Sequence, residues 1–172
     1  MAGTTGNLFS GGVTKFGIGW GVTTDLGFTK GGVKISRDVT WLDFEVDQFR
    51  ATMKKQVVKN EMKITTTLAE GALKALQVGW GMPTTALLSN SSYLNLVETD
   101  GNASNNMELD IYFEGPGPSG KTRVYNFYRS VAMGTTEYNI SRGEESNVPV
   151  EFHILYDNSQ TPAKFGEMWD KP

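Results

Sequence analysis

The sequence predicts a mainly β protein, an antiparallel β-sandwich or barrel with one short amphipathic α-helix, at about residues 68–79, covering an edge or a face. Three observations support this fold class. Several segments alternate apolar and polar residues, glycine accounts for 20 of the 172 residues, and only one segment has helical periodicity. A chain of this length is most simply a single domain, residues 1–172, and we expect its Gly-rich N-terminus, about 1–12, to form a flexible arm.

The composition excludes several kinds of site. There is no cysteine, so disulfides and thiolate metal sites are absent, and the single histidine, His153, cannot form a multi-histidine metal site within one chain. The formal net charge of −3 gives no basic footprint for tight nucleic-acid binding. Without a signal-like start or a run of eighteen apolar residues, we expect a soluble protein made in a cytoplasm.

The first clear strand pattern is WLDFEVDQF, residues 41–49. Its apolar side chains alternate with three acids, so we expect a half-buried strand whose outer face is formed by Asp43, Glu45 and Asp47. A base-rich stretch follows, which contains Arg50, Lys54, Lys55 and Lys59. The β-branched segment EMKITTTL, residues 61–68, is then typical of a second strand.

The helix is predicted by a start signal, an apolar stripe and a stop signal. Thr67 and Glu70 have the spacing of a capping box, in which each side chain accepts a backbone N–H. The following residues, AEGALKALQVGWG, place leucines and alanines along one stripe, and Gly79 and Gly81 end it.

Most of the remaining chain is predicted to be β. YLNLVE, MELDIYFE, TRVYNFYRSVAM and NVPVEFHILYD are strand candidates, and the last would bury Val148, Val150, Phe152, Ile154 and Tyr156 on one face. MELDIYFE presents a second acidic face, formed by Glu108, Asp110 and Glu114.

One stretch imitates a nucleotide-binding loop. Residues 115–122, GPGPSGKT, fit the pattern G-x-x-x-x-G-K-[ST], which needs a strand before it and a helix behind it. The segment behind it has strand periodicity instead, and Pro116 and Pro118 have no N–H to donate to a phosphate. We therefore expect a hairpin turn with Lys121 as a loop charge.

No catalytic residue, cofactor or metal is predicted. Three carboxylates on one straight strand face do not have the usual geometry of a metal site, and His153 has no nucleophile signature beside it. The aromatic residues are explained by β-core packing better than by base stacking, because a basic groove is missing. The sequence therefore predicts a protein that is not an enzyme.

The order of these parts resembles the tail tube, or major tail, proteins of long-tailed bacteriophages. The resemblance rests on a strand that runs to VDQF, on EMKITTTLAE passing directly into GALKALQVGWG, and on the C-terminal stretch VPVEFHILYDNSQTPAKFG. It spans roughly residues 15 to 168. The glycine-broken N-terminal third does not match the family strand by strand.

The resemblance implies a structural virion protein that self-assembles into hexameric rings, which stack into the tail tube through which DNA passes during genome ejection. The base-rich stretch would be an inter-ring loop that orders on stacking. The acidic face of Asp43, Glu45 and Asp47 and that of Glu108, Asp110 and Glu114 would be the two candidates for lining the lumen or an interface. The implied partners are further copies of the chain, the tape measure protein and DNA in the lumen, the tail terminator and baseplate or tip proteins, and a sheath protein if the tail is contractile. It implies no membrane partner and a place in the virion tail, assembled in the host cytoplasm.

Two other interpretations remain open. The aromatic residues and Asn-rich loops also fit a carbohydrate- or protein-binding β-sandwich used in adhesion or receptor binding. A secretion-system tube protein of similar architecture fits the same sequence features as the phage tube.

Overall fold

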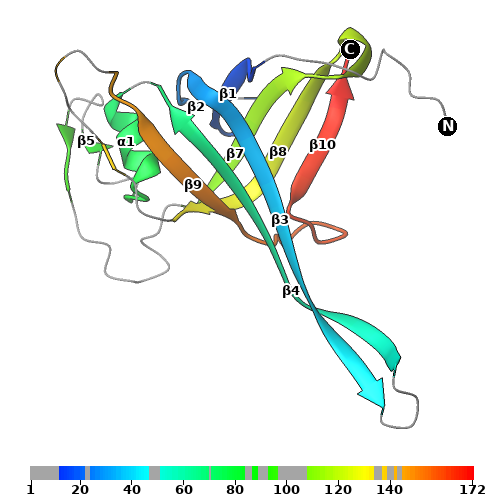
Figure 1. Ribbon diagram of the computed structural model, residues 1–172. Coiled ribbons are helices and arrows are strands. Elements are labelled where there is room, and N and C mark those ends of the chain that lie inside the picture. The colour runs from blue at the N-terminus through cyan, green and yellow to red at the C-terminus, as the bar shows by residue number, and fades with distance from the viewer. Residues whose placement is uncertain are drawn as a thin grey trace.

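A computed structural model of the chain describes residues 12–21, 24–46, 51–69, 71–83, 87–88, 93–96, 108–133, 137–138, 142 and 145–172 (Figure 1). This part of the chain is mainly β, with one α-helix, as the sequence predicts. The strands before the helix are β1 (Lys15–Ile18), β2 (Thr24–Asp25), β3 (Thr29–Val46) and β4 (Ala51–Leu68). Those after it are β5 (Leu87–Leu88), β6 (Tyr93–Leu94), β7 (Glu108–Pro116), β8 (Thr122–Ala132), β9 (Val148–Ile154) and β10 (Gly166–Lys171).

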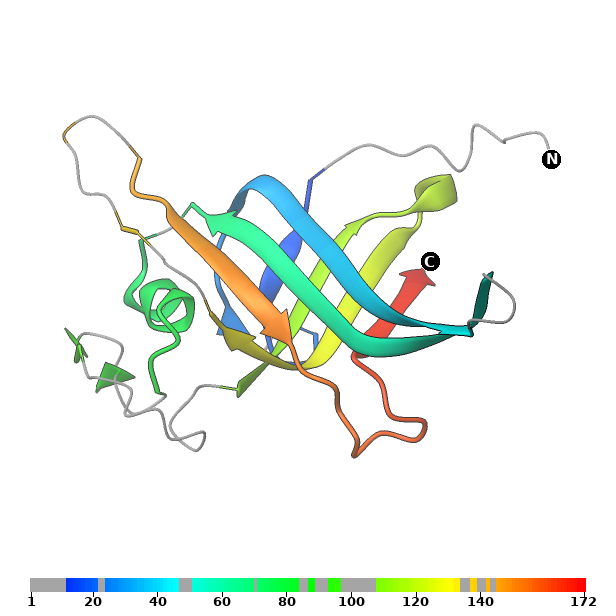
Figure 2. The same cartoon turned by 60° about the horizontal axis from the view of Figure 1, so that its bottom comes forward.

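Eight of these strands form one antiparallel sheet. Its order is β2-β1-β7-β8-β9-β4-β3, while β5 and β6 pair separately. Strand β8 has two partners on one side, because β10 pairs with residues 122–127 and β9 pairs with residues 130–132. The sheet bends past this point, so that β3, β4 and β9 form one layer over β1, β7, β8 and β10 (Figures 1 and 2).

The core lies between the two layers. The ring of Phe16 on β1 is 5.9 Å from that of Phe113 beside it and 6.4 Å from that of Phe152 in the opposite layer. The predicted buried face of β9 is confirmed for Val148, Val150, Phe152 and Ile154, but Tyr156 lies past the end of the strand and is exposed. Alternation therefore places one face of each central strand in the core.

The helix begins later than the sequence predicts. Helix α1 spans Leu73–Gly79, its N-cap is Ala72, and no side chain of the described residues caps it. The predicted cap at Thr67 is wrong: Thr67 belongs to β4, where it pairs with Lys30 and Pro149. The β-branched run before Leu68 continues the ladder on both sides, and this pairing overrides the capping signal. Glu70 lies outside the described residues.

The nucleotide-loop imitation is a hairpin turn, as predicted. Strands β7 and β8 flank it, with Pro116 opposite Thr122, and the Gly117 N–H donates to the Lys121 carbonyl at 2.8 Å. A short 3₁₀ turn, Pro118–Gly120, fills the corner. The strand β8 occupies the place where a phosphate loop needs its helix.

The longest strands, β3 and β4, form a two-stranded ribbon that projects from the body (Figure 1). Strand β9 pairs with β4 only between Met62 and Leu68, so residues 38–46 and 51–61 pair only with one another. We call these residues the ribbon. The predicted base-rich loop is wrong for Lys54, Lys55 and Lys59, because they belong to β4; Arg50 lies outside the described residues.

Candidate interaction surfaces

The described residues contain no group of three or more His, Asp or Glu side chains that could hold a metal ion. In the same residues, no helix is long and apolar enough to cross a bilayer. The surfaces that distinguish this structure are exposed apolar ones. Three of them stand out: the ribbon, an aromatic stack on the outer face of β7, and a hollow at the foot of the ribbon.

The ribbon exposes large apolar side chains to solvent. Trp41 is 55% exposed and Val58 is 64% exposed, and Leu42, Phe44 and Val57 are exposed as well. The predicted strand is present, but it is not half-buried, since no second layer covers either face of the ribbon among the described residues. A single two-stranded hairpin is at most marginally stable in water.

The register of the ribbon separates its side chains between two faces. Leu42 lies opposite Gln56 and Phe44 lies opposite Lys54, so these four side chains share one face. Trp41 faces the other way, opposite Val57. The register shifts at two points, between Thr40 and Trp41 and between Phe44 and Glu45, so β4 carries an extra residue at each.

Of the three acids predicted on the outer face of this strand, the structure describes the side chain of Asp43. Asp43 lies on the Trp41 face and pairs with Lys55 at 3.1 Å, so its carboxylate is not a free charge. Lys59 pairs with Glu61 at 2.8 Å, and its hydrogen bond lowers the pKa of the Glu61 carboxyl. Asp47 and the side chain of Glu45 lie outside the described residues.

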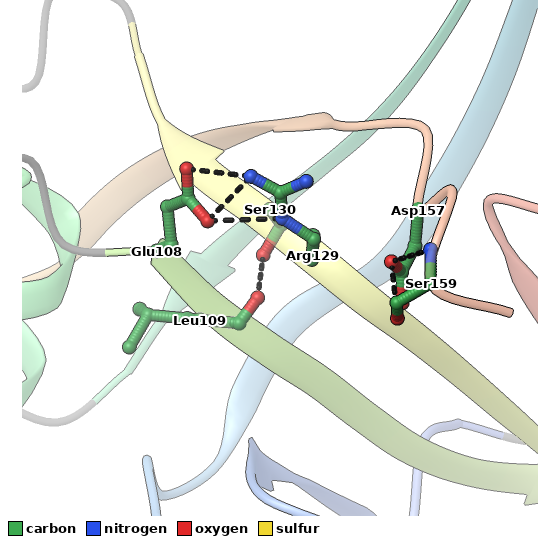
Figure 3. Close-up of polar contacts among 6 residues, drawn as sticks. All are labelled: Glu108, Leu109, Arg129, Ser130, Asp157 and Ser159. Atoms are coloured by element: carbon green, nitrogen blue, oxygen red, sulfur yellow. Dashed lines mark hydrogen bonds and ion pairs between the residues drawn. The ribbon is translucent and has the colours of Figure 1, made fainter. Parts of the chain in front are cut away.

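The second predicted acidic face lies on β7, and each acid there has a local partner. Arg129 donates two hydrogen bonds of 3.0 Å to Glu108 (Figure 3), and the Gly19 N–H donates to Asp110 at 3.1 Å. Glu114 is only 7% exposed and accepts the Tyr112 hydroxyl at 2.7 Å. Burial and this carboxylate raise the pKa of Tyr112 to about 12.

Other polar contacts fix the strand ends around Glu108. The Ser130 hydroxyl donates to the Leu109 carbonyl at 2.7 Å, at the register shift between β7 and β8 (Figure 3). After β9, the N–H of Ser159 and its hydroxyl both donate to Asp157, at 3.0 and 2.7 Å. These bonds to Ser159 lower the pKa of the Asp157 carboxyl. The contacts hold the loop that leads from β9 to β10.

An aromatic stack lies on the outer face of the same layer. The Trp20 ring is stacked on Trp169 with 5.2 Å between centroids and 15° between planes, and it remains 58% exposed. Positive φ angles at Gly19 and Gly21 allow the turn, and the Gly19 N–H also donates to the Asp110 carbonyl. In the sequence, the signal for this exposed ring is a Trp between two glycines.

The hollow lies where β9 ends beside β4, at the foot of the ribbon. It has a volume of about 720 Å³, and its apolar wall consists of Met62, Met133, Tyr156 and Phe165. We call it the methionine hollow. Met133 is 52% exposed, and Tyr156 meets Phe165 edge to face at 5.2 Å. Glu61 and His153 lie at its polar side.

His153 is a surface group in this hollow. Its Nε2 is 2.8 Å from a Glu151 oxygen, which also accepts from Lys63 at 3.2 Å. Both contacts lower the pKa of the Glu151 carboxyl, with Lys63 the larger cause. The arrangement is an ion-paired strand face rather than an acid–base pair beside a nucleophile.

A comparison with models of known protein families finds no match for this chain, and a search of curated proteins finds none either.

Proposed function

We propose that the chain is a non-catalytic structural subunit that self-assembles. The observation that carries this proposal is the ribbon, which holds a tryptophan, a leucine, a phenylalanine and two valines in solvent. Exposed apolar side chains gathered on both faces of one ribbon in this way mark an interaction surface in soluble proteins. A ribbon that is marginal by itself gains stability when another molecule covers it.

A second copy of the chain is the simplest partner. The sheet leaves β3 without a neighbour on one side over 18 residues and β10 without one over six, within the described residues. Unpaired strand edges can accept a strand from another molecule. A contact between unlike surfaces of identical copies produces a closed ring or an open filament.

The resemblance to tail tube proteins selects the form of this assembly. On that basis the assembly is a stack of hexameric rings that forms a phage tail tube and carries DNA during genome ejection. Its partners are the tape measure protein and DNA in the lumen, and the tail terminator, baseplate or tip and sheath proteins outside it. It requires no cofactor and resides in the virion tail.

Electron microscopy in negative stain, combined with light scattering, tests this function. The concentrated protein is expected to form hollow rings or stacked tubes. Replacing Trp41 and Phe44 by Ser should abolish assembly and leave the body folded. The matched control replaces Tyr93 and Leu96, two exposed apolar residues outside the ribbon, by Ser, and should assemble normally. A strictly monomeric wild-type protein at all concentrations contradicts the proposal.

The aromatic stack supports a second candidate, a carbohydrate-binding module. Trp20 offers an open ring held in place from behind by Trp169, and sugars bind to such platforms by stacking. A glycan-array screen of wild type and Trp20→Ala distinguishes the two functions. Glycan binding by a monomer that is lost in Trp20→Ala favours the binding module.

A further inference from the structure

We infer that the methionine hollow is the acceptor for the ribbon of a second copy, through the face that carries Leu42 and Phe44. The inference rests on the proposed self-assembly and specifies the two surfaces that meet. The proposed function requires only that another copy cover the ribbon, and it does not specify which surface of that copy does so.

The hollow has the composition of an acceptor. Two methionines and two aromatic rings form its apolar wall, and Met133 and Tyr156 are both more than half exposed. Methionine is flexible and polarizable, so it adapts to the shape of an incoming aromatic or aliphatic side chain. Its volume of about 720 Å³ is sufficient for two side chains of the size of leucine and phenylalanine.

The ribbon cannot fill the hollow of its own molecule. Lys54, the partner of Phe44, lies eight residues along β4 from Met62 at the hollow. At the rise of a β-strand, this separation is roughly 25 Å. The paired strands keep the two sites apart, so the side chain that enters the hollow must come from another copy.

The ribbon face carries a lysine, and the hollow carries a carboxylate that is paired with a lysine of its own chain. Lys54 shares the face of Leu42 and Phe44, and it forms no ion pair in the part of the chain that the structure describes. Glu61 lies at the polar side of the hollow, where its own partner Lys59 is exposed. Docking of Phe44 would bring the Lys54 ammonium towards this carboxylate.

A single contact of this kind is small. Aromatic side chains bury about 150–250 Å² each, so the ribbon face supplies a few hundred Å², below the ~800 Å² per partner of a standard interface. Each copy has one ribbon and one hollow, so the contact can repeat from copy to copy and gain from multivalency. The experiment must therefore trap a weak pairwise contact.

The absence of cysteine makes such trapping unambiguous. We would mix a Leu42→Cys variant with a Met133→Cys variant under mild oxidation and follow the disulfide-linked heterodimer on non-reducing gels. The control partner is Met168→Cys, which replaces another methionine that is 62% exposed but lies on β10, away from the hollow. A second pair, Phe44→Cys with Tyr156→Cys, tests the same contact from different side chains.

The expected result is a heterodimer that forms at least about tenfold faster with Met133→Cys than with Met168→Cys, because docking raises the local thiol concentration into the millimolar range. A chain that carries both Leu42→Cys and Met133→Cys should give a ladder of linked oligomers. Equal rates with both partners, or no cross-link in either pair, overturn the acceptor assignment if the unmodified protein still assembles. A wild-type protein that never assembles overturns the proposed function itself.

Discussion

At the scale of single residues, Gly166 marks a close approach between strands β10 and β8. A Cβ atom built there would lie 2.3 Å from the Asn126 carbonyl oxygen and 2.9 Å from the Phe127 Cα. Both neighbours are backbone atoms of β8, so neither can move aside without disturbing the pairing with β10. Glycine is therefore required at position 166, because the backbone of β8 leaves no room for a side chain.

We predict that Gly166→Ala destabilises the fold by about 1–3 kcal/mol, the usual cost of overpacking. Urea unfolding of the variant and the wild type measures the difference. Gly12→Ala is the control, because a Cβ there would meet nothing within 4 Å and should change stability by less than ~0.5 kcal/mol. Equal unfolding midpoints for Gly166→Ala and wild type would contradict the close packing of β10 on β8.

Tyr112 links stability to alkaline pH. Burial and the Glu114 carboxylate raise its pKa from 10.0 to about 12, so between these values the folded state holds a proton that the unfolded state has lost. Stability is therefore unaffected by this group below pH 10 and falls as pH rises from 10 to 12, by at most about 3 kcal/mol. Denaturant unfolding between pH 9 and 12 should show that the free energy of unfolding falls more steeply with pH in the wild type than in Tyr112→Phe. Parallel curves would mean that Tyr112 ionises normally in the folded protein.

At the scale of secondary-structure elements, sequence periodicity predicted the strands well and their surroundings less well. Alternation located β7, β8 and β9 because each has one face in the core. The same alternation in residues 41–46 indicated a strand but could not show that no layer covers it. The signal at Thr67 was misleading, since local capping competes with a ladder to Lys30 and Pro149 that only the tertiary fold supplies.

The β7–β8 turn gives a test of the nucleotide-loop imitation. Since β8 begins at Thr122, no helix N-terminus points at the turn. We predict no heat of binding in a calorimetric titration with ATP and magnesium. Lys121→Ala should change stability by less than ~0.5 kcal/mol, as an exposed loop substitution does. Saturable ATP binding that Lys121→Ala removes would contradict the assignment of a simple hairpin.

The ribbon should differ from the core in its dynamics. Its strands pair only with each other and lie in solvent, so in the monomer their amide hydrogens should exchange well before those of β7 and β8. On assembly, exchange in residues 38–46 and 51–61 should slow by at least about tenfold, since another copy covers them. Hydrogen exchange read by mass spectrometry resolves both segments. Unchanged ribbon exchange in assembled particles would exclude the ribbon from the contact.

At the scale of the whole molecule, the surfaces that combine distant segments could not be predicted from the sequence. The methionine hollow combines residues from β4, the end of β8 and the loop after β9, which only the folded sheet brings together. The acids of β7 were correctly grouped on one strand, but their partners Gly19 and Arg129 lie on other elements. A pattern along one strand shows which side chains share a face, but it does not show which groups on other elements form hydrogen bonds or ion pairs with them.

Net charge bears on the interaction with DNA. With 19 acids against 16 bases, and hence a formal charge of −3, assembled particles should not retain double-stranded DNA at physiological salt, because their net charge repels phosphate. Co-sedimentation of particles with DNA measures retention. Asp43→Lys, which also frees Lys55, should raise retention in a salt-dependent way if this strand faces the DNA. Strong retention by wild type would contradict a lumen through which DNA slides.

The attachment of the ribbon has a mechanical consequence. Strand β4 enters the body alongside β9 through seven consecutive residue pairs, from Met62 to Leu68. A pull along the ribbon acts parallel to these strands, so it loads all of their hydrogen bonds together in shear rather than opening them one after another. An assembly joined through such ribbons would resist axial tension with the body of each subunit and would bend most easily where each ribbon leaves its own body.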